Sequence, residues 1–220
     1  MTLGNASPLD DIDLVVFDLF GTLIEITDRR RPFAHLKRKM TPEKALKFRR
    51  LAMTTEMTLS EIDAELQGGA TVADLVVAQT AIAHEVASVR IRPGVQEILA
   101  ALPAQYGLCS NLSLDYVPTL DRFPEITPMF RILSCFAGCM KPDPRIYELV
   151  LEAAGVPADR ILFVGDTPSA DIDGPAQAGM RAVHIDAFLN SFAGGDKRDD
   201  FGDAFRAARG TVSRDLDIES

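Results

Sequence analysis

The stretch that decides the fold is Leu14-Val15-Val16-Phe17-Asp18-Leu19-Phe20-Gly21-Thr22. Four apolar residues in a row are typical of a strand that is buried on both faces of a sheet. Asp18 follows this run directly, and open α/β sheets hold their ligands at the carboxyl ends of their strands. An acid that ends a strand is often only the N-cap of the next element, so the rest of the chain must decide its role.

Three further segments place chemically active side chains in similar positions. Leu108-Cys109-Ser110-Asn111 is a second apolar run, and it ends in a hydroxyl and an amide. Ile161-Leu162-Phe163-Val164-Gly165-Asp166-Thr167 repeats the layout of the first stretch, and Asp171 follows it closely. Between these two segments, Lys141-Pro142-Asp143-Pro144 places a lysine just before a helical pattern over residues 145–154. The chain thus carries, in order, an acid, a hydroxyl, a lysine and a pair of acids.

The alternation of apolar strands and helical patterns predicts an α/β fold with a doubly wound, Rossmann-like parallel sheet. The pattern changes over residues 32–89, where the apolar positions have helical periodicity. Thr41 followed by Pro42 is a start signal for one helix, residues 59–61 start another, and Gly68-Gly69 breaks the pattern. We therefore expect an inserted group of helices and no strand of the main sheet over residues 40–85.

The order of these motifs resembles that of the haloacid dehalogenase-like hydrolase superfamily, whose members are mostly phosphatases that act through an aspartyl-phosphate intermediate. The resemblance covers the segments around residues 10–26 and 92–186. It implies that Asp18 is the nucleophile, Ser110 the hydroxyl of the second motif, Lys141 the lysine of the third, and Asp166 with Asp171 the acids of the fourth. The insert has the size and position of the helical cap in the subgroup that includes the dehalogenases. This implies a core of residues 1–26 and 91–220 and a cap domain of residues 27–90.

A magnesium site is a further implication of the resemblance. A carboxylate that attacks a phosphoryl group brings negative charge to negative charge, so a divalent cation and a lysine must offset it. Mg²⁺ prefers hard oxygen ligands and keeps several waters. The resemblance assigns these ligands to Asp18, the backbone carbonyl of Phe20 and Asp166, with Asp171 as a further ligand or as a residue that orients the others.

Phe20 departs from the usual phosphatase pattern. Most phosphatases of the superfamily carry there a second Asp, which works as general acid and base, so Phe20 implies a good leaving group, a water in its place, or a substitute acid such as Glu56 or Glu61. Dehalogenases have an aromatic residue at this place and lack the acidic metal site. We expect a phosphatase, because carboxylates clustered around Asp18 without a cation would repel one another. The alternatives are a 2-haloacid dehalogenase that uses the same nucleophile and a binding protein without turnover.

Three residues are candidates for substrate contact. Phe20 is expected to be a wall of the substrate pocket, since it lies one pleat from Asp18. Asn111 either touches the substrate or satisfies a turn. Arg49 falls where the dehalogenases place an arginine that grips the substrate. Tyr147, six residues after Lys141, has the spacing of a functional tyrosine in those enzymes, although on a helix it equally suits buried packing.

Composition sets the remaining limits. A chain of 220 residues with 47% hydrophobic content can form one large domain or a core with a small insert, and its net charge of −9 argues against a nucleic-acid partner. The basic residues at 29–39 favour a solvated surface over a rim that steers phosphate. The three cysteines lie in apolar segments without zinc spacing, so we expect buried thiols in a reducing compartment. No apolar run approaches the roughly 20 residues that cross a bilayer, so we expect a soluble, cytoplasmic protein that takes a small phosphorylated metabolite. A short helix is expected at residues 203–208.

Overall fold

The computed structural model describes residues 11–102 and 106–193 of the chain, so the short helix expected at 203–208 lies outside the described residues. Five parallel strands form the main sheet in the order β5-β4-β1-β6-β7. The strands are β1 (Leu14–Phe17), β4 (Tyr106–Ser110), β5 (Phe130–Leu133), β6 (Ile161–Gly165) and β7 (Arg181–His184). The strand numbering runs outward in both directions from β1, which confirms the predicted doubly wound α/β sheet.

The central strand β1 is buried on both faces, as its apolar run predicts. Val15 and Phe17 belong to one hydrophobic cluster, whereas Leu14 and Val16 belong to a second one on the other face of the sheet. Helices cover both faces: α5 (Val95–Ala101), α6 (Ser134–Ala137), α7 (Pro144–Ala154), α8 (Gly174–Gln177) and α9 (Ile185–Ala193). The predicted core thiols are confirmed, because Cys109, Cys135 and Cys139 are all buried and free.

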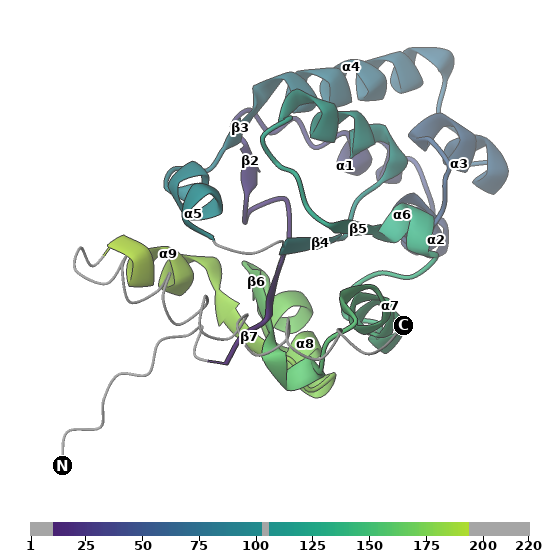
Figure 1. The fold of residues 1–220 in the computed structure, drawn as a ribbon. Coiled ribbons are helices and arrows are strands. Elements are labelled where there is room, and N and C mark those ends of the chain that lie inside the picture. The colour runs from purple at the N-terminus through teal and green to yellow at the C-terminus, as the bar shows by residue number, and fades with distance from the viewer. Residues whose placement is uncertain (1–10, 103–105, 194–220) are drawn as a thin grey trace, which may run out of the picture.

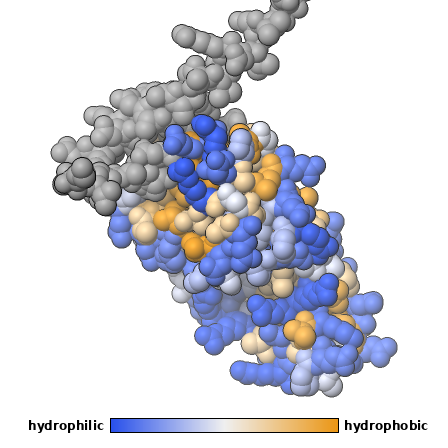
Figure 2. Space-filling model, turned by 90° about the horizontal axis from the view of Figure 1, so that it is seen from below, coloured by the Kyte–Doolittle hydropathy of each residue, from blue (hydrophilic) through white to orange (hydrophobic). Residues whose placement is uncertain are grey.

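Short connecting helices complete the core. They are the 3₁₀ segments η1 (Leu114–Arg122) and η2 (Ala158–Arg160) and the π segment η3 (Pro168–Asp173). Helix α7 begins where the sequence predicts, because Asp143 accepts a hydrogen bond from the backbone N–H of Arg145 and Pro144 occupies the first turn. Figure 2 shows a surface that is mostly hydrophilic on the face seen from below, with small separate hydrophobic areas. Within the part of the chain that the structure describes, no helix is both long and apolar enough to cross a membrane.

Four helices, which we call the helical insert, lie between two short strands outside the main sheet. They are α1 (Pro32–Lys37), α2 (Pro42–Thr54), α3 (Leu59–Leu66) and α4 (Val72–Ser88). The short strands β2 (Ile24–Ile26) and β3 (Val89–Ile91) pair antiparallel and form the stem of the insert. Figure 1 shows α1, α3 and α4 above the sheet and α2 next to α6 at the level of β5, all of them far from β7 and α8. Residues 40–85 contribute no strand to the main sheet, as expected.

Two of the four insert helices, α2 and α3, begin where the sequence predicts a helix start, although the residue that caps α3 is Thr58, one position before the predicted start. Thr41 accepts a hydrogen bond from the backbone N–H of Lys44, and Pro42 takes the first turn of α2. Thr58 and Glu61 form a capping box at the start of α3, in which each satisfies a backbone N–H of the other. Glu61 is therefore held in a structural role.

Candidate active site

The four sequence motifs meet at the carboxyl edge of the sheet. Asp18 follows β1, Ser110 ends the neighbouring strand β4, and Asp166 follows β6 on the other side of β1. Because parallel strands end at the same edge, their terminal residues lie close together. The hydroxyl of Ser110 donates to Oδ1 of Asp18 at 3.1 Å. Both side chains are buried, so this contact is shielded from bulk water.

Lys141 joins the acids of the first and fourth motifs. Its ammonium group donates to Oδ1 of Asp18 at 2.8 Å, to Oδ1 of Asp171 at 2.6 Å and to the carbonyl of Cys109 at 2.9 Å. The side chain is only 4% exposed, and these three acceptors use all three of its hydrogen atoms. A buried lysine with this complement of partners is held as a fixed positive charge beside Asp18.

The charged groups of this cluster change one another's pKa values. Burial raises the pKa of Asp18 above the ordinary value for an aspartate, and the neighbouring Lys141 ammonium opposes this shift only in part. Burial also disfavours the charged form of Lys141, but the carboxylates of Asp18 and Asp171 outweigh it and raise the pKa of the lysine. Lys141 thus stays protonated at neutral pH.

Asn111 holds the backbone of Lys141. Its side-chain N–H donates to the Lys141 carbonyl at 2.8 Å, and its side-chain oxygen accepts the Lys141 N–H, also at 2.8 Å. Asn111 was expected either to touch the substrate or to satisfy a turn. The structure gives it a partner that lies thirty residues away in the sequence, and the same residue lines both cavities described below.

The acids of the predicted metal site form one cluster. Carboxylate oxygens of Asp18, Asp166 and Asp171, one from each, lie within 4.8 Å of one another. The two oxygens of Asp171 are already engaged, because Oδ1 pairs with Lys141 and Oδ2 accepts the backbone N–H groups of Asp166 at 3.1 Å and Thr167 at 2.9 Å. This arrangement favours Asp171 as the residue that orients the cluster and leaves Asp18 and Asp166 to contact a cation.

The donor set fits a hard divalent cation. The ligand atoms that the three residues offer are all carboxylate oxygens, which Mg²⁺ prefers. The backbone at Gly21 lies close to the carboxylate of Asp166, and only a glycine allows this. Its φ of 92° is in the left-handed region, and a Cβ at this position would overlap the Asp166 carboxylate. The chain therefore uses a glycine to bring the loop after Asp18 against the acid after β6.

Phe20 lies on the wall of a cavity of about 520 Å³ that also includes Asp166, Thr167 and Asn111. Its ring packs edge-on against the ring of Tyr116, with 6.0 Å between the centroids. Tyr116 comes from η1 and also stacks on Phe33 of the insert. Phe20 was expected at the wall of a pocket, and in the structure it lines a cavity wall together with other aromatic side chains.

Two residues that the sequence analysis missed join the insert to this cavity. Glu85 of α4 is buried and accepts the backbone N–H groups of Arg30 at 2.6 Å and Arg31 at 2.7 Å. Its other oxygen accepts a hydrogen bond from the hydroxyl of Tyr116. The available signal was the buried stripe of α4, where Ala78 and Ile82 precede Glu85 at helical spacing. An acid on that stripe must have buried partners.

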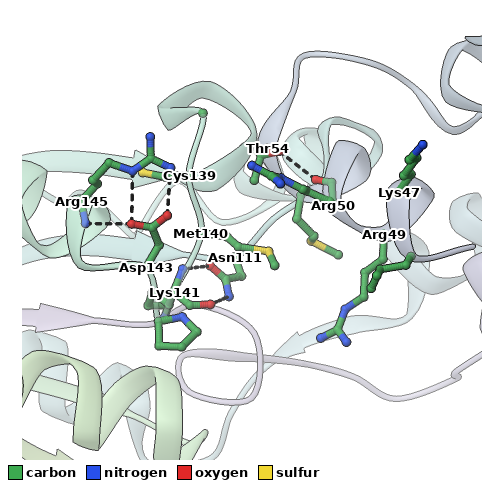
Figure 3. A pocket seen from close by; sticks show the side chains of 14 residues that line it. Lys47, Arg49, Arg50, Thr54, Asn111, Cys139, Met140, Lys141, Asp143 and Arg145 are labelled. Carbon is green, nitrogen blue, oxygen red and sulfur yellow. Dashed lines mark hydrogen bonds and ion pairs between the residues drawn. The ribbon is translucent and has the colours of Figure 1, made fainter. Parts of the chain in front are cut away.

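A second, larger cavity of about 790 Å³ lies between α2 and the loop that carries Lys141. Arg49 lines it together with Asn111 and Lys141 (Figure 3). Arg49 thus faces the loop of the third motif across a cavity. Tyr147, by contrast, is buried in the core, where its hydroxyl donates to the carbonyl of Ala170 at 2.6 Å, so the packing interpretation of this residue is the one the structure supports.

Comparison with known proteins identifies sequence relatives of this chain. The sequence model of the haloacid dehalogenase-like hydrolases matches residues 12–179. A phosphoglycolate phosphatase of Pseudomonas savastanoi pv. phaseolicola is 31% identical over 194 residues, which cover 78% of this chain and 68% of that protein. A phosphoserine phosphatase of Thermus thermophilus is 42% identical over 58 residues, but the chain spans only 23% of that protein's length.

The fold itself also recurs among solved structures. A HAD family enzyme of Bacteroides thetaiotaomicron, in complex with magnesium and inorganic phosphate, has a TM-score of 0.55 at 19% identity, over 79% of this chain and 93% of that one. Similarity at this level shows a shared fold. The family match over residues 12–179 and the 31% identity to the phosphoglycolate phosphatase show that the chain belongs to the haloacid dehalogenase-like hydrolases.

Proposed function

We propose that this hydrolase is a Mg²⁺-dependent phosphatase that acts on a small phosphorylated metabolite through an aspartyl-phosphate intermediate. The observation that carries the proposal is the cluster of Asp18, Asp166 and Asp171 beside Lys141. Three carboxylates at one buried site repel one another unless a cation joins them, and one lysine offsets only part of their charge. The relatives named phosphoglycolate and phosphoserine phosphatases support the same chemistry.

The residues take distinct roles in this proposal. Asp18 attacks the phosphorus, so that a bond forms from its carboxylate oxygen while the ester bond from phosphorus to the leaving oxygen breaks. Lys141 and Ser110 hold the oxygens around Asp18 and lower the cost of bringing two anions together. Water then attacks the phosphorus while the bond from phosphorus to the Asp18 oxygen breaks, so that inorganic phosphate leaves and the carboxylate is restored. One proton of the water stays on the phosphate, and the other balances the alkoxide released in the first step. Asp18, Asp166 and the carbonyl of Phe20 would hold Mg²⁺, which offsets the charge of the transferring phosphoryl group when bound.

We further propose that residues 27–90 are a cap domain on a core of residues 1–26 and 91–220. The boundary positions lie on the β2–β3 stem, where Ile26 pairs with Val89 and Glu25 pairs with Arg90. Two short paired strands are a natural place for one part of a chain to move against another. Such a movement would open and close the cavities that lie between α2, η1 and the loop of Lys141.

One observation favours a second candidate, a 2-haloacid dehalogenase. Phe20 supplies no proton to a leaving group, and a departing halide needs none. The position of Asp166 against Gly21 and near Asp18 argues for the phosphatase, because a halide-releasing site gains nothing from an additional carboxylate. A protein that only binds its ligand is the third possibility, and it predicts Mg²⁺ binding without turnover.

The test is a release assay on three substrates: an activated aryl phosphate, an alkyl phosphate and a 2-haloacid, each with Mg²⁺ and with EDTA. We expect phosphate release with Mg²⁺ and none with EDTA, and no halide release. In Asp18→Asn, turnover should fall to background while substrate still binds, since the amide retains the shape but lacks the charge to attack. Halide release that persists in EDTA would establish the dehalogenase instead, and full activity of Asp18→Asn would contradict the assignment of the nucleophile.

Mg²⁺ binding can be followed without turnover. Mg²⁺ should raise the melting temperature of the wild-type protein by mass action, and Asp166→Ala should abolish this rise while leaving the fold intact by circular dichroism. An equal rise in the wild type and in Asp166→Ala would remove Asp166 from the metal site.

A further inference from the structure

The larger cavity, between α2 and the loop at residues 138–145, contains an excess of positive charge. Its lining includes Lys47, Arg49 and Arg50 from α2, and Arg145 with the acid Asp143 from the core side. Four cations therefore face one carboxylate, apart from Lys141, whose ammonium pairs with Asp18 and Asp171. This excess is unusual in a chain whose net charge is −9, and it concentrates a positive potential in one concave surface.

Two of these cations have no partner among the residues that the structure describes. Arg145 pairs with Asp143 at 2.8 Å, and Lys47 pairs with Glu43 at 3.0 Å. For Arg49 and Arg50 the structure shows no ion pair and no side-chain hydrogen bond within the described ranges. Figure 3 shows both side chains extending from α2 into the space that faces Asn111, Lys141 and Asp143. Two guanidinium groups are thus available to an anion that enters this cavity.

The larger cavity shares lining residues with the smaller cavity and with the cluster around Asp18. Asn111 and Met53 line both this cavity and the smaller one that holds Phe20 and Asp166. Lys141 contributes to the larger cavity while its ammonium contacts Asp18. Asn111 and Lys141 are therefore the residues that connect the surroundings of Asp18 with the cavity wall formed by α2.

We propose that Arg49 and Arg50 form a binding site for a carboxylate of the substrate, so that the enzyme selects phosphorylated acids over phosphorylated alcohols. The proposal rests on the phosphatase function proposed above and adds the substrate class. A guanidinium presents a planar fork of donors that matches a carboxylate in a bidentate arrangement. The pKa of Asp143 is lowered first by Arg145 and also by the charge of Arg50. The positive charge of Arg50 therefore acts on a carboxylate that lines this cavity.

The smaller cavity is a weaker candidate for the same role. It includes Arg29, Arg31 and Lys37, but it also includes Glu85 and Asp166. These two acids repel a second anion and offset much of the positive charge. The aromatic side chains of Phe20, Phe33 and Tyr116 on its wall suit an apolar group better than a carboxylate.

The experiment compares 2-phosphoglycolate with 2-hydroxyethyl phosphate, two esters of similar size of which only the first carries a carboxylate. We measure kcat and KM with Mg²⁺ for the wild type, Arg49→Gln, Arg50→Gln and the double variant. The wild type should favour the acid, and each single substitution should lower the ratio of kcat/KM between acid and alcohol about tenfold, mainly through a higher KM for the acid. Gln retains helix propensity close to that of Arg, so α2 should persist.

Two controls separate this site from general charge effects. Arg38→Gln removes an exposed cation from the insert at a position outside both cavities, and it should leave the ratio unchanged. Arg29→Gln removes a cation from the smaller cavity. A loss of preference in Arg29→Gln but not in Arg49→Gln and Arg50→Gln would place the carboxylate in the smaller cavity and overturn the proposal.

The remaining outcomes distinguish the two proposals. If the wild type hydrolyses both esters with a ratio that Arg49→Gln and Arg50→Gln do not change, the carboxylate site is wrong and the phosphatase stands. If the wild type hydrolyses neither ester with Mg²⁺ but releases phosphate from the activated aryl phosphate, the carboxylate site is wrong and the phosphatase stands. If it releases phosphate from none of the three substrates, both proposals are wrong.

Discussion

Oδ1 of Asp171 lies 2.6 Å from the ammonium nitrogen of Lys141, closer than Oδ1 of Asp18, which lies at 2.8 Å. The other oxygen of Asp171 accepts the N–H groups of Asp166 and Thr167. One buried carboxylate thus fixes both the lysine that contacts Asp18, the proposed nucleophile, and the backbone that carries the proposed metal ligand. We therefore expect Asp171 to act by positioning these groups and not by contact with the substrate.

The first prediction concerns this carboxylate. Asp171→Ala should lower the free energy of unfolding by about 3–5 kcal/mol, because it removes a partner from a buried charge and an acceptor from two N–H groups. Asp171→Asn should destabilise the protein less, since the amide oxygen can still accept from the backbone. Activity in Asp171→Asn should nevertheless fall about 10–100-fold, as is typical when a residue that orients metal ligands is changed. Urea unfolding and kcat measure the two effects.

Asp173→Asn is the matched control, because Asp173 lies on the same segment η3 but is exposed. It should change neither stability nor kcat. If Asp171→Asn behaved in the same way as Asp173→Asn, the orienting role of Asp171 would be wrong.

The second prediction concerns the approach of Gly21 to Asp166. Gly21 and Gly69 have similar left-handed conformations, with φ of 92° and 85°. A Cβ at Gly69 would meet nothing within 4 Å, whereas one at Gly21 would overlap the Asp166 carboxylate. Gly69→Ala should therefore cost only the backbone strain, about 1 kcal/mol. Gly21→Ala should cost more and should also weaken Mg²⁺ binding, as measured by the shift in melting temperature with added Mg²⁺. Equal Mg²⁺ responses in the two variants would show that Asp166 does not bind the ion.

Much of the architecture and of the candidate site was predictable from local sequence signals. The apolar runs before Asp18, Ser110 and Asp166 each form a strand of one parallel sheet, and parallel strands necessarily bring their last residues to one edge. The helix start at Pro42 followed from the hydroxyl cap Thr41 and the proline, and the start at Leu59 followed from residues 59–61, although its cap proved to be Thr58. These signals are local, because each depends on residues that are close in the sequence.

The features that escaped prediction depend on partners distant in the sequence. Strands β2 and β3 have only three residues each, too few for a periodic pattern, and they exist because they pair with each other. Glu85 binds the backbone of residues 30 and 31 and the hydroxyl of Tyr116, and no spacing rule connects these positions. The two hydrogen bonds from Asn111 to the backbone of Lys141 were invisible for the same reason.

The third prediction concerns the contact of Tyr116 with Glu85, which joins η1 of the core to α4 of the insert. Tyr116→Phe removes a donor from a buried carboxylate and should lower the free energy of unfolding by about 1.5–3 kcal/mol. The N–H groups of Arg30 and Arg31, which bind the same carboxylate, should exchange faster with deuterium. Tyr147→Phe is the control. The Tyr147 hydroxyl binds a neutral carbonyl within the core, so its loss should leave the exchange of the Arg30 and Arg31 N–H groups unchanged. Unchanged exchange at Arg30 and Arg31 in Tyr116→Phe would contradict a link between this contact and the insert.

The last prediction concerns the proton that Phe20 cannot supply. Phe20→Asp should raise the hydrolysis of an alkyl phosphate relative to that of an activated aryl phosphate, by up to about 10²–10⁴-fold, because only the alkyl leaving group needs a general acid. Phe20→Asn has nearly the same size as Phe20→Asp but carries no acid, so it should not produce this gain. The added carboxylate would stand near Asp18 and Asp166, and its repulsion should be relieved by Mg²⁺. A gain of equal size in Phe20→Asn would show that the ring of Phe20 only obstructs the site. No gain in either variant would show that a carboxyl group at position 20 does not reach the leaving oxygen, and it would contradict the prediction.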